Sequence, residues 1–67
     1  MNFSKRLGIK LRSAMYINNI SIKDISNQTE LSNKDVNRLI KGRLILSPRM
    51  LTKVCDVIGI SVNDLLR

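Results

Sequence analysis

The sequence predicts an all-α fold in which five short helices pack as one domain over residues 1–67. Three serines, Ser21, Ser32 and Ser61, are each followed by aspartate three positions later. In such a pair the hydroxyl accepts from a backbone N–H at a helix start, and the carboxylate lies where the helix dipole favours negative charge. Apolar residues recur at spacings of three and four, and no strand candidate stands out. These patterns together favour a helical domain.

The first helix is expected to start after Ser4 and to end near Ile17, with an apolar stripe at helical spacing: Phe3, Leu7, Leu11, Ala14 and Met15. Gly8 within it costs about 1 kcal/mol relative to alanine. Asn18 and Asn19 are suited to its end, because asparagine tolerates the left-handed conformation.

The second helix is expected over residues 22–29, and Glu30 and Leu31 form the turn that follows it. The third is expected over residues 33–41, ended by Gly42 and burying its apolar side, which comprises Val36, Leu39 and Ile40. Two starts only eleven residues apart leave room for a short helix, a tight turn and a second helix. In a basic chain this arrangement suggests a helix-turn-helix.

Ser47 is expected to cap the fourth helix, with Pro48 at its first position, where a missing N–H costs nothing. Its inward side is Leu51, Val54, Cys55 and Ile58, and Gly59 ends it. A third capping box at Ser61 opens a short terminal helix that contains Leu65 and Leu66. The three apolar residues of the loop before Ser47, residues 44–46, are expected either to tuck under the fourth helix or to form part of a dimer surface.

Charge points to the class of partner. Twelve Lys and Arg against five acids give a net charge of +7, which favours a polyanion such as nucleic acid or an anionic membrane surface. No signal peptide and no apolar run of about 18 residues is visible, so we expect a cytoplasmic protein with no membrane span.

Catalysis is disfavoured, and no metal site or cofactor is expected. The chain has no histidine, which removes the commonest metal ligand and acid–base catalyst. No pair of acids stands out as catalytic. Cys55 lies in an apolar helix, where a buried thiol is expected rather than a nucleophile.

The arrangement resembles the Xre family of phage repressor and Cro-type proteins over nearly the whole chain. The residues that carry the resemblance lie between Ile20 and Gly42, where six occupy the positions that set the angle between the two helices: Ile25, Ser26, Leu31, Val36, Leu39 and Gly42. The resemblance implies a lambda-repressor-like domain and a sequence-specific transcriptional regulator of a phage or mobile element.

Three positions depart from the family pattern. Ile22 stands where relatives commonly carry a glutamine that contacts DNA, and Glu30 replaces the usual turn glycine. Relatives also pair a glutamate near the end of the third helix with an arginine of the first. Here those positions are Ile40 and Met15, so we expect an apolar contact instead.

A recognition helix buries one side and offers the other to the major groove. The outward residues expected to contact bases are Asn33, Lys34, Asn37 and Arg38. Asn pairs with adenine, and Lys or Arg with guanine. The residues expected to contact phosphates are Lys23, Lys41 and Arg43.

The expected partner is a double-stranded DNA operator. Relatives dimerise on it, and the candidate dimer or partner surface comprises Leu44, Ile45, Val62 and Leu66. A monomer that pairs only on DNA fits the sequence equally well. The main alternative is a modulator that keeps this fold but binds another repressor, which the apolar loop and off-stripe Ile9, Tyr16 and Ile17 favour. A cationic membrane-surface peptide is disfavoured, because several capped short helices suit a globular fold.

Overall fold

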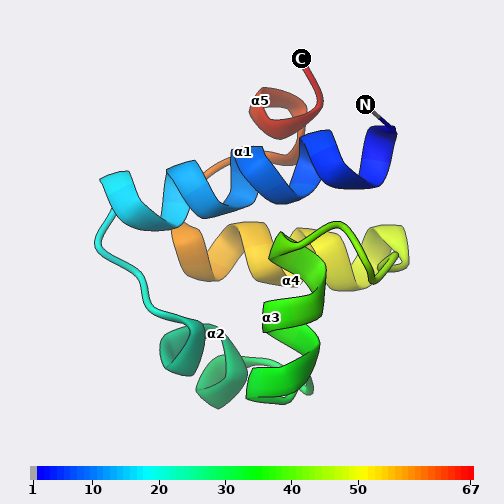
Figure 1. Ribbon diagram of the computed structural model, residues 1–67. Helices are drawn as coiled ribbons and strands as arrows, with labels where there is room; N and C mark the ends of the chain where they lie inside the picture. Colours follow the sequence, from blue (N-terminus) through cyan, green and yellow to red (C-terminus); the bar gives the residue numbers. More distant parts are fainter. Residues whose placement is uncertain (1) are drawn as a thin grey trace.

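The computed structural model describes residues 2–67, and Met1 of the expected domain lies outside them. The helices are α1 (Phe3–Ile17), α2 (Ile22–Gln28), α3 (Asn33–Ile40), α4 (Pro48–Ile58) and α5 (Val62–Leu66). Within residues 2–67 there is no strand. Figure 1 shows α1 running above α4, α5 on the outer side of α1, and α2 and α3 below. The all-α, five-helix expectation is confirmed, with helix ends within one or two residues of those expected.

One apolar core joins all five helices. Its buried members are Leu7, Leu11, Met15, Ile25, Val36, Leu39, Leu51, Val54, Cys55, Ile58 and Leu65. Val36 and Leu39 of α3 and all expected inward residues of α4 are among them, whereas Ile40 is only half-buried and Phe3 is exposed. The buried stripe of α1 therefore begins at Leu7, and Phe3 lines a surface hollow with Leu65 and Leu66 of α5.

The helix starts follow the expected capping pattern, with two corrections. Asn2, not Ser4, caps α1, and its Oδ1 accepts from the backbone N–H of Lys5 at 2.8 Å. At α5 the Ser61 hydroxyl accepts from the N–H of Asp64 at 3.1 Å, which is the hydroxyl half of the expected box. Ser47 caps α4 with Pro48 at its start, as expected.

Two glycines let α1 and α3 approach closely. A Cβ atom on Gly8 would lie 2.5 Å from the carbonyl oxygen of Ile40, and one on Gly42 would lie 2.7 Å from Cα of Lys5. Both distances are shorter than any real Cβ contact, so only glycine fits there. The close packing of α1 on α3 therefore requires glycine at position 8, despite its cost in helix propensity.

A hydrogen bond joins the carboxyl ends of α1 and α4, which are far apart in the sequence. The side-chain amide of Asn18, the C-cap of α1, donates to the carbonyl oxygen of Ile58 at 2.9 Å. Asn19 follows with φ 56°, and Gly59 ends α4 with φ 90°. Both left-handed positions were expected from the residue types.

The three apolar residues of the loop after α3 differ in burial. Leu44 and Leu46 are half-buried and pack against the core, whereas Ile45 is 83% exposed. The core expectation therefore holds for two of the three. Among the described residues, no helix is long and apolar enough to cross a membrane.

Candidate nucleic-acid interface

Both helices of the expected helix-turn-helix begin with complete capping boxes. At α2 the Ser21 hydroxyl accepts from Asp24 N–H at 3.0 Å, and the Asp24 carboxylate accepts from Ser21 N–H at 2.9 Å. At α3 the corresponding distances between Ser32 and Asp35 are 3.1 and 3.4 Å. The backbone hydrogen bond from Ser21, with that from its hydroxyl, lowers the pKa of Asp24. The carboxylate thus stays charged at the positive end of the helix dipole.

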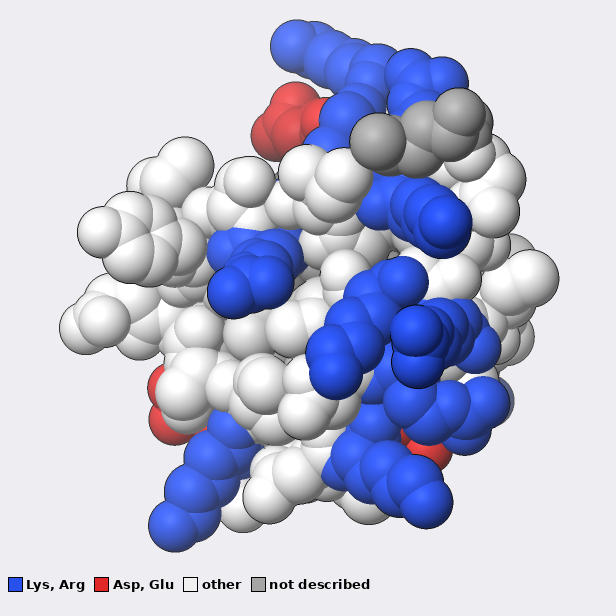
Figure 2. All heavy atoms as spheres, viewed as in Figure 1, with Lys and Arg blue, Asp and Glu red and all other residues white. Residues whose placement is uncertain are grey.

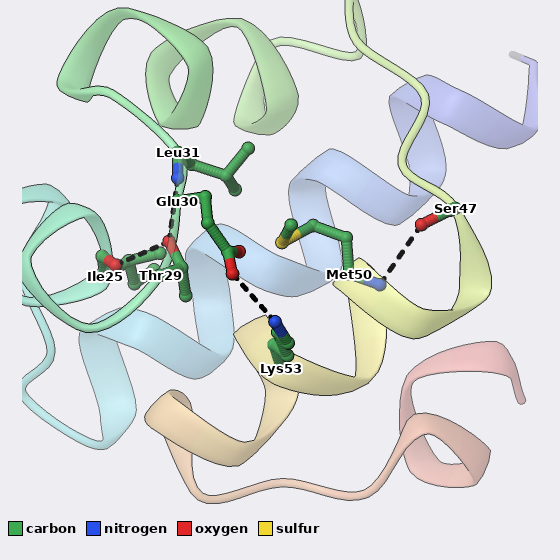
Figure 3. A network of polar contacts seen from close by, with 7 residues as sticks. All are labelled: Ile25, Thr29, Glu30, Leu31, Ser47, Met50 and Lys53. Atoms are coloured by element: carbon green, nitrogen blue, oxygen red, sulfur yellow. Dashed lines mark hydrogen bonds and ion pairs between the residues drawn. The ribbon is translucent and has the colours of Figure 1, made fainter.

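The turn between α2 and α3 is formed without a left-handed residue. Thr29 adopts extended backbone, and Asn19 is the sole non-glycine with positive φ among residues 2–67. The Thr29 hydroxyl donates to Ile25 C=O at 2.8 Å and accepts from Leu31 N–H at 3.2 Å, as Figure 3 shows. Glu30 is therefore unstrained where relatives use glycine.

Glu30 instead joins the turn to α4. Its carboxylate lies 2.8 Å from the ammonium of Lys53, and this hydrogen bond lowers the pKa of Glu30 (Figure 3). Both groups are well exposed to solvent, so the pair contributes little to stability.

The two sides of α3 separate as expected. Val36 and Leu39 are buried, and the four expected base-contact residues, Asn33, Lys34, Asn37 and Arg38, are all exposed. The helical period places these four side chains on the exposed side of α3, where residues 33 to 38 span about 8 Å of the helix axis. That surface presents amide and cationic donors suited to base edges.

Two of the four side chains already have partners. The hydroxyl of Ser26 in α2 lies 2.6 Å from Oδ1 of Asn33 and 3.1 Å from the carbonyl oxygen of Lys23. A hydroxyl has one proton, and the shorter contact indicates that Asn33 receives it. The Asn33 amide is then held with its NH₂ group free to donate. Arg38 lies 3.9 Å from the Asp35 carboxylate, too long for a strong pair.

The expected phosphate-contact residues lie on two segments, the start of α2 and the end of α3. Lys23 is exposed in the first turn of α2, Lys41 is the C-cap of α3, and Arg43 follows Gly42. Figure 2 shows Lys and Arg side chains gathered over the part of the molecule where Figure 1 draws α3, the following loop and the start of α4.

Arg49 is an exposed residue of this surface that was not among the expected DNA contacts. It lies in the first turn of α4, one position after Pro48. The Ser47–Pro48 helix start predicts that Arg49 lies in the first turn of the fourth helix, next to the basic loop.

The residues of the candidate dimer or partner surface lie on two segments. Leu44 and Ile45 belong to the loop after α3, and Val62 and Leu66 belong to α5. Leu44 and Val62 pack against the core, which leaves Ile45 and Leu66 as the exposed apolar side chains.

Met15 and Ile40 stand at the positions where relatives have an ion pair, and an apolar contact between them stays a prediction. Both line one hollow between α1 and α3, with Asn37 at its edge. Met15 is buried and Ile40 packs against the same core.

The described residues offer no metal centre, since no group of three His, Cys, Asp or Glu side chains is placed to hold an ion. Cys55 is buried, and burial raises the pKa of its thiol. A buried thiol with a raised pKa is a poor nucleophile.

Comparison with known proteins agrees with this arrangement. The family model described as a Cro/C1-type HTH DNA-binding domain matches residues 10–67. Two crystal structures of the clp gene regulator ClgR from Corynebacterium glutamicum superpose with a TM-score of 0.93 at 27% identity. The alignment covers 98% of this chain in both cases, and 85% and 70% of the two ClgR chains. No curated protein sequence matches.

Proposed function

Because the chain belongs to the Cro/C1-type helix-turn-helix DNA-binding family, we propose that it is a sequence-specific transcription regulator whose α3 contacts bases in the major groove. The observation that carries the proposal is the exposed side of α3, where Asn33, Lys34, Asn37 and Arg38 lie opposite buried Val36 and Leu39. The likeness to the regulator ClgR supports it.

In the proposed complex, Lys23, Lys41 and Arg43 contact phosphates on either side of the groove, and Arg49 adds to them. The net charge of +7 supplies long-range attraction to DNA. Base contacts then set the sequence preference, at about 1–3 kcal/mol for each good bidentate pair.

The proposal extends to the biological role of the regulator. Resemblance of residues 20–42 to Xre proteins favours a repressor or Cro-like regulator of a phage or mobile element, acting in the cytoplasm. Two copies on one operator would place their recognition helices about 34 Å apart, with Ile45 and Leu66 as the exposed apolar candidates for contact between them. A reporter promoter containing the selected site tests the direction of regulation, and lower expression supports repression.

Selection of binding sites from random double-stranded DNA with purified protein tests the proposal most directly. We expect an enriched motif. Arg38→Ala should relax the preference at particular base pairs, whereas Lys41→Ala should weaken binding to all sequences alike. A uniform loss with both variants would contradict the assignment of Arg38 to base contact.

The second candidate is a modulator that binds another repressor. The exposed apolar side chains of α1 favour it, with Tyr16 at 87% and Ile17 at 78% exposure. If neither the free protein nor a dimerised form binds DNA at low salt, this candidate replaces the first.

A further inference from the structure

The outer side of α1 carries an apolar surface that the core does not use. Ile9 is 52% exposed and lies with Tyr16 on the side of α1 opposite Leu7 and Leu11, and exposed Ile17 is next to them on the flank of the helix. In Figure 2 uncharged side chains protrude at the left, where Figure 1 draws the end of α1. Exposed apolar residues gathered on a small domain commonly mark an interface.

This surface has a ridge flanked by two hollows, a shape that can pack against another helix. Ile9, Ser13 and Ile17 recur every four residues and so form one ridge along α1. A hollow lies on each side of the ridge and includes all three residues: Ile40 closes one, and Ile60 and Leu65 close the other. Ser13, small and central, leaves room for a large side chain between the two isoleucines.

We propose that this surface, Ile9, Ser13, Tyr16 and Ile17, docks an amphipathic helix of another protein that carries acidic side chains beside its apolar stripe. The charges at the rim support this choice. Arg12 borders one hollow; Lys10 and Asp64 border the other. Two cations and one acid, on a chain of net charge +7, favour an acidic occupant.

Charge also disfavours a second copy of this chain as the occupant. A two-fold axis through Ser13 would place Ile9 against Ile17 of the other copy. Arg12 borders one hollow, so the same axis would place both copies of this cation at the rim of the interface. Two chains of net charge +7 would then meet, and their like charge opposes association.

The docking surface adjoins one end of the recognition surface. α1 meets α3 at the carboxyl end of α3, where Gly8 approaches Ile40, and Tyr16 lines a hollow together with Asn37 and Lys41. Asn33 and Lys34 lie at the opposite end of α3. Docking of the helix can be measured in the absence of DNA, so its test does not depend on DNA binding.

Three synthetic peptides test the proposal on the whole chain. The first has three heptads with leucine at positions a and d and glutamate at e and g, so that self-repulsion keeps it monomeric. The second replaces glutamate with lysine, and the third scrambles the first. We expect the acidic amphipathic peptide to bind at least about tenfold more tightly than either control, with amide NMR shifts centred on residues 9–17.

Variants locate the binding. Ile17→Gln and Ile9→Gln should each weaken the acidic peptide about tenfold, the effect of losing one buried apolar side chain. Phe3→Gln is the matched control, because Phe3 is 64% exposed on the same helix but lies outside both hollows. Circular dichroism confirms that each variant is folded.

Each contrary outcome overturns the proposal. Equal binding of the scrambled peptide would show attraction by charge alone, and equal binding of the lysine peptide would show that acids are not selected. Absence of binding by the acidic peptide would show that the surface does not dock helices of this kind. Self-association that Ile17→Gln abolishes would identify a second copy as the occupant. DNA binding is measured in a separate experiment, so failure of the peptide to bind does not contradict the proposed DNA-binding function.

Discussion

Single side chains set how α2 presents α3. Ser26 of α2 holds the Asn33 amide at 2.6 Å, across the angle between the two helices. Ile22 stands where relatives carry a glutamine that contacts DNA, and its side chain has no polar atom. Ser26 lies one turn further along α2, and its hydroxyl orients the Asn33 side chain at the start of α3. In the proposed complex Ser26 is therefore a positioning residue for a base contact.

Ser26→Ala tests this role. Alanine favours helix, so α2 should remain folded while Asn33 loses its partner. We expect discrimination at one base pair to fall about two- to tenfold, the worth of one hydrogen bond, with preferences at the other base pairs kept. Binding-site selection on the variant measures the change. Thr52→Ala, which removes a hydroxyl hydrogen-bonded within α4, should leave the whole profile intact, and an unchanged profile for Ser26→Ala would contradict the role.

At the scale of elements, capping decides where each short helix begins. Ser21 and Ser32 each satisfy a backbone N–H that the helix itself leaves without a partner. Ser21→Ala should lower the free energy of unfolding by about 1 kcal/mol, the usual effect of losing an N-cap. Urea denaturation measures it. Asn63→Ala changes an exposed residue inside α5, and a loss as large there would show that capping is not the cause.

The capping box of α2 also makes stability depend on pH. Asp24 has a folded-state pKa below its ordinary value of 3.8 because Ser21 donates to its carboxylate. A group with a lowered pKa stabilises the fold above its unfolded pKa, and this contribution disappears as pH falls through the folded pKa. Asp24→Asn should therefore be less stable than the parent protein at pH 7, and the difference should shrink below pH 3.8.

Urea denaturation at pH 7 and at pH 2 checks that difference. Asp56→Asn is the matched control, since it removes an exposed carboxylate in α4 that caps no helix. A difference for Asp24→Asn that stays constant with pH would rule out the carboxylate charge as its source.

The contact between α1 and α3 depends on Gly8. In an exposed helix, Gly→Ala gains about 1 kcal/mol, but here the added Cβ would meet backbone atoms of Ile40 at 2.5 and 2.9 Å. We expect Gly8→Ala to lower the free energy of unfolding by about 1–3 kcal/mol, as overpacking does. Ser13→Ala, on the exposed side of the same helix, should be neutral or stabilising. A stabilised Gly8→Ala protein would contradict the close approach.

At the scale of the whole molecule, net charge should control DNA binding. The logarithm of the association constant should fall linearly with the logarithm of salt concentration, with a slope of about −0.9 for each phosphate contacted. Lys41→Ala and Arg43→Ala should each reduce the magnitude of that slope by about 1. Arg6→Ala removes the same charge from a site beside α5, so its slope should match that of the parent protein.

The sequence predicted most of this architecture because its helix boundaries are encoded locally. Ser47–Pro48 and Gly59 bracket α4, and Ser21 and Ser32 start α2 and α3, where the structure has them. The exposed side of α3 followed from helical period alone. Contacts between distant segments could not be predicted in this way. The approach of Gly8 to Ile40, the Asn18–Ile58 bond and the Ser26–Asn33 bond depend on how helices cross, which no local pattern specifies.

The turn at Thr29 has a consequence for how this chain can evolve. A glycine-dependent turn restricts its central position to one residue type, but the backbone here requires no left-handed conformation at position 30. That position is free to drift among L-amino acids while Thr29 keeps the geometry of the turn. The pKa of the Glu30 carboxyl is lowered first by its hydrogen bond from Lys53 and also by the charge of Arg49. Mutation at this one codon can therefore tune the charge of the basic surface without altering the angle between α2 and α3.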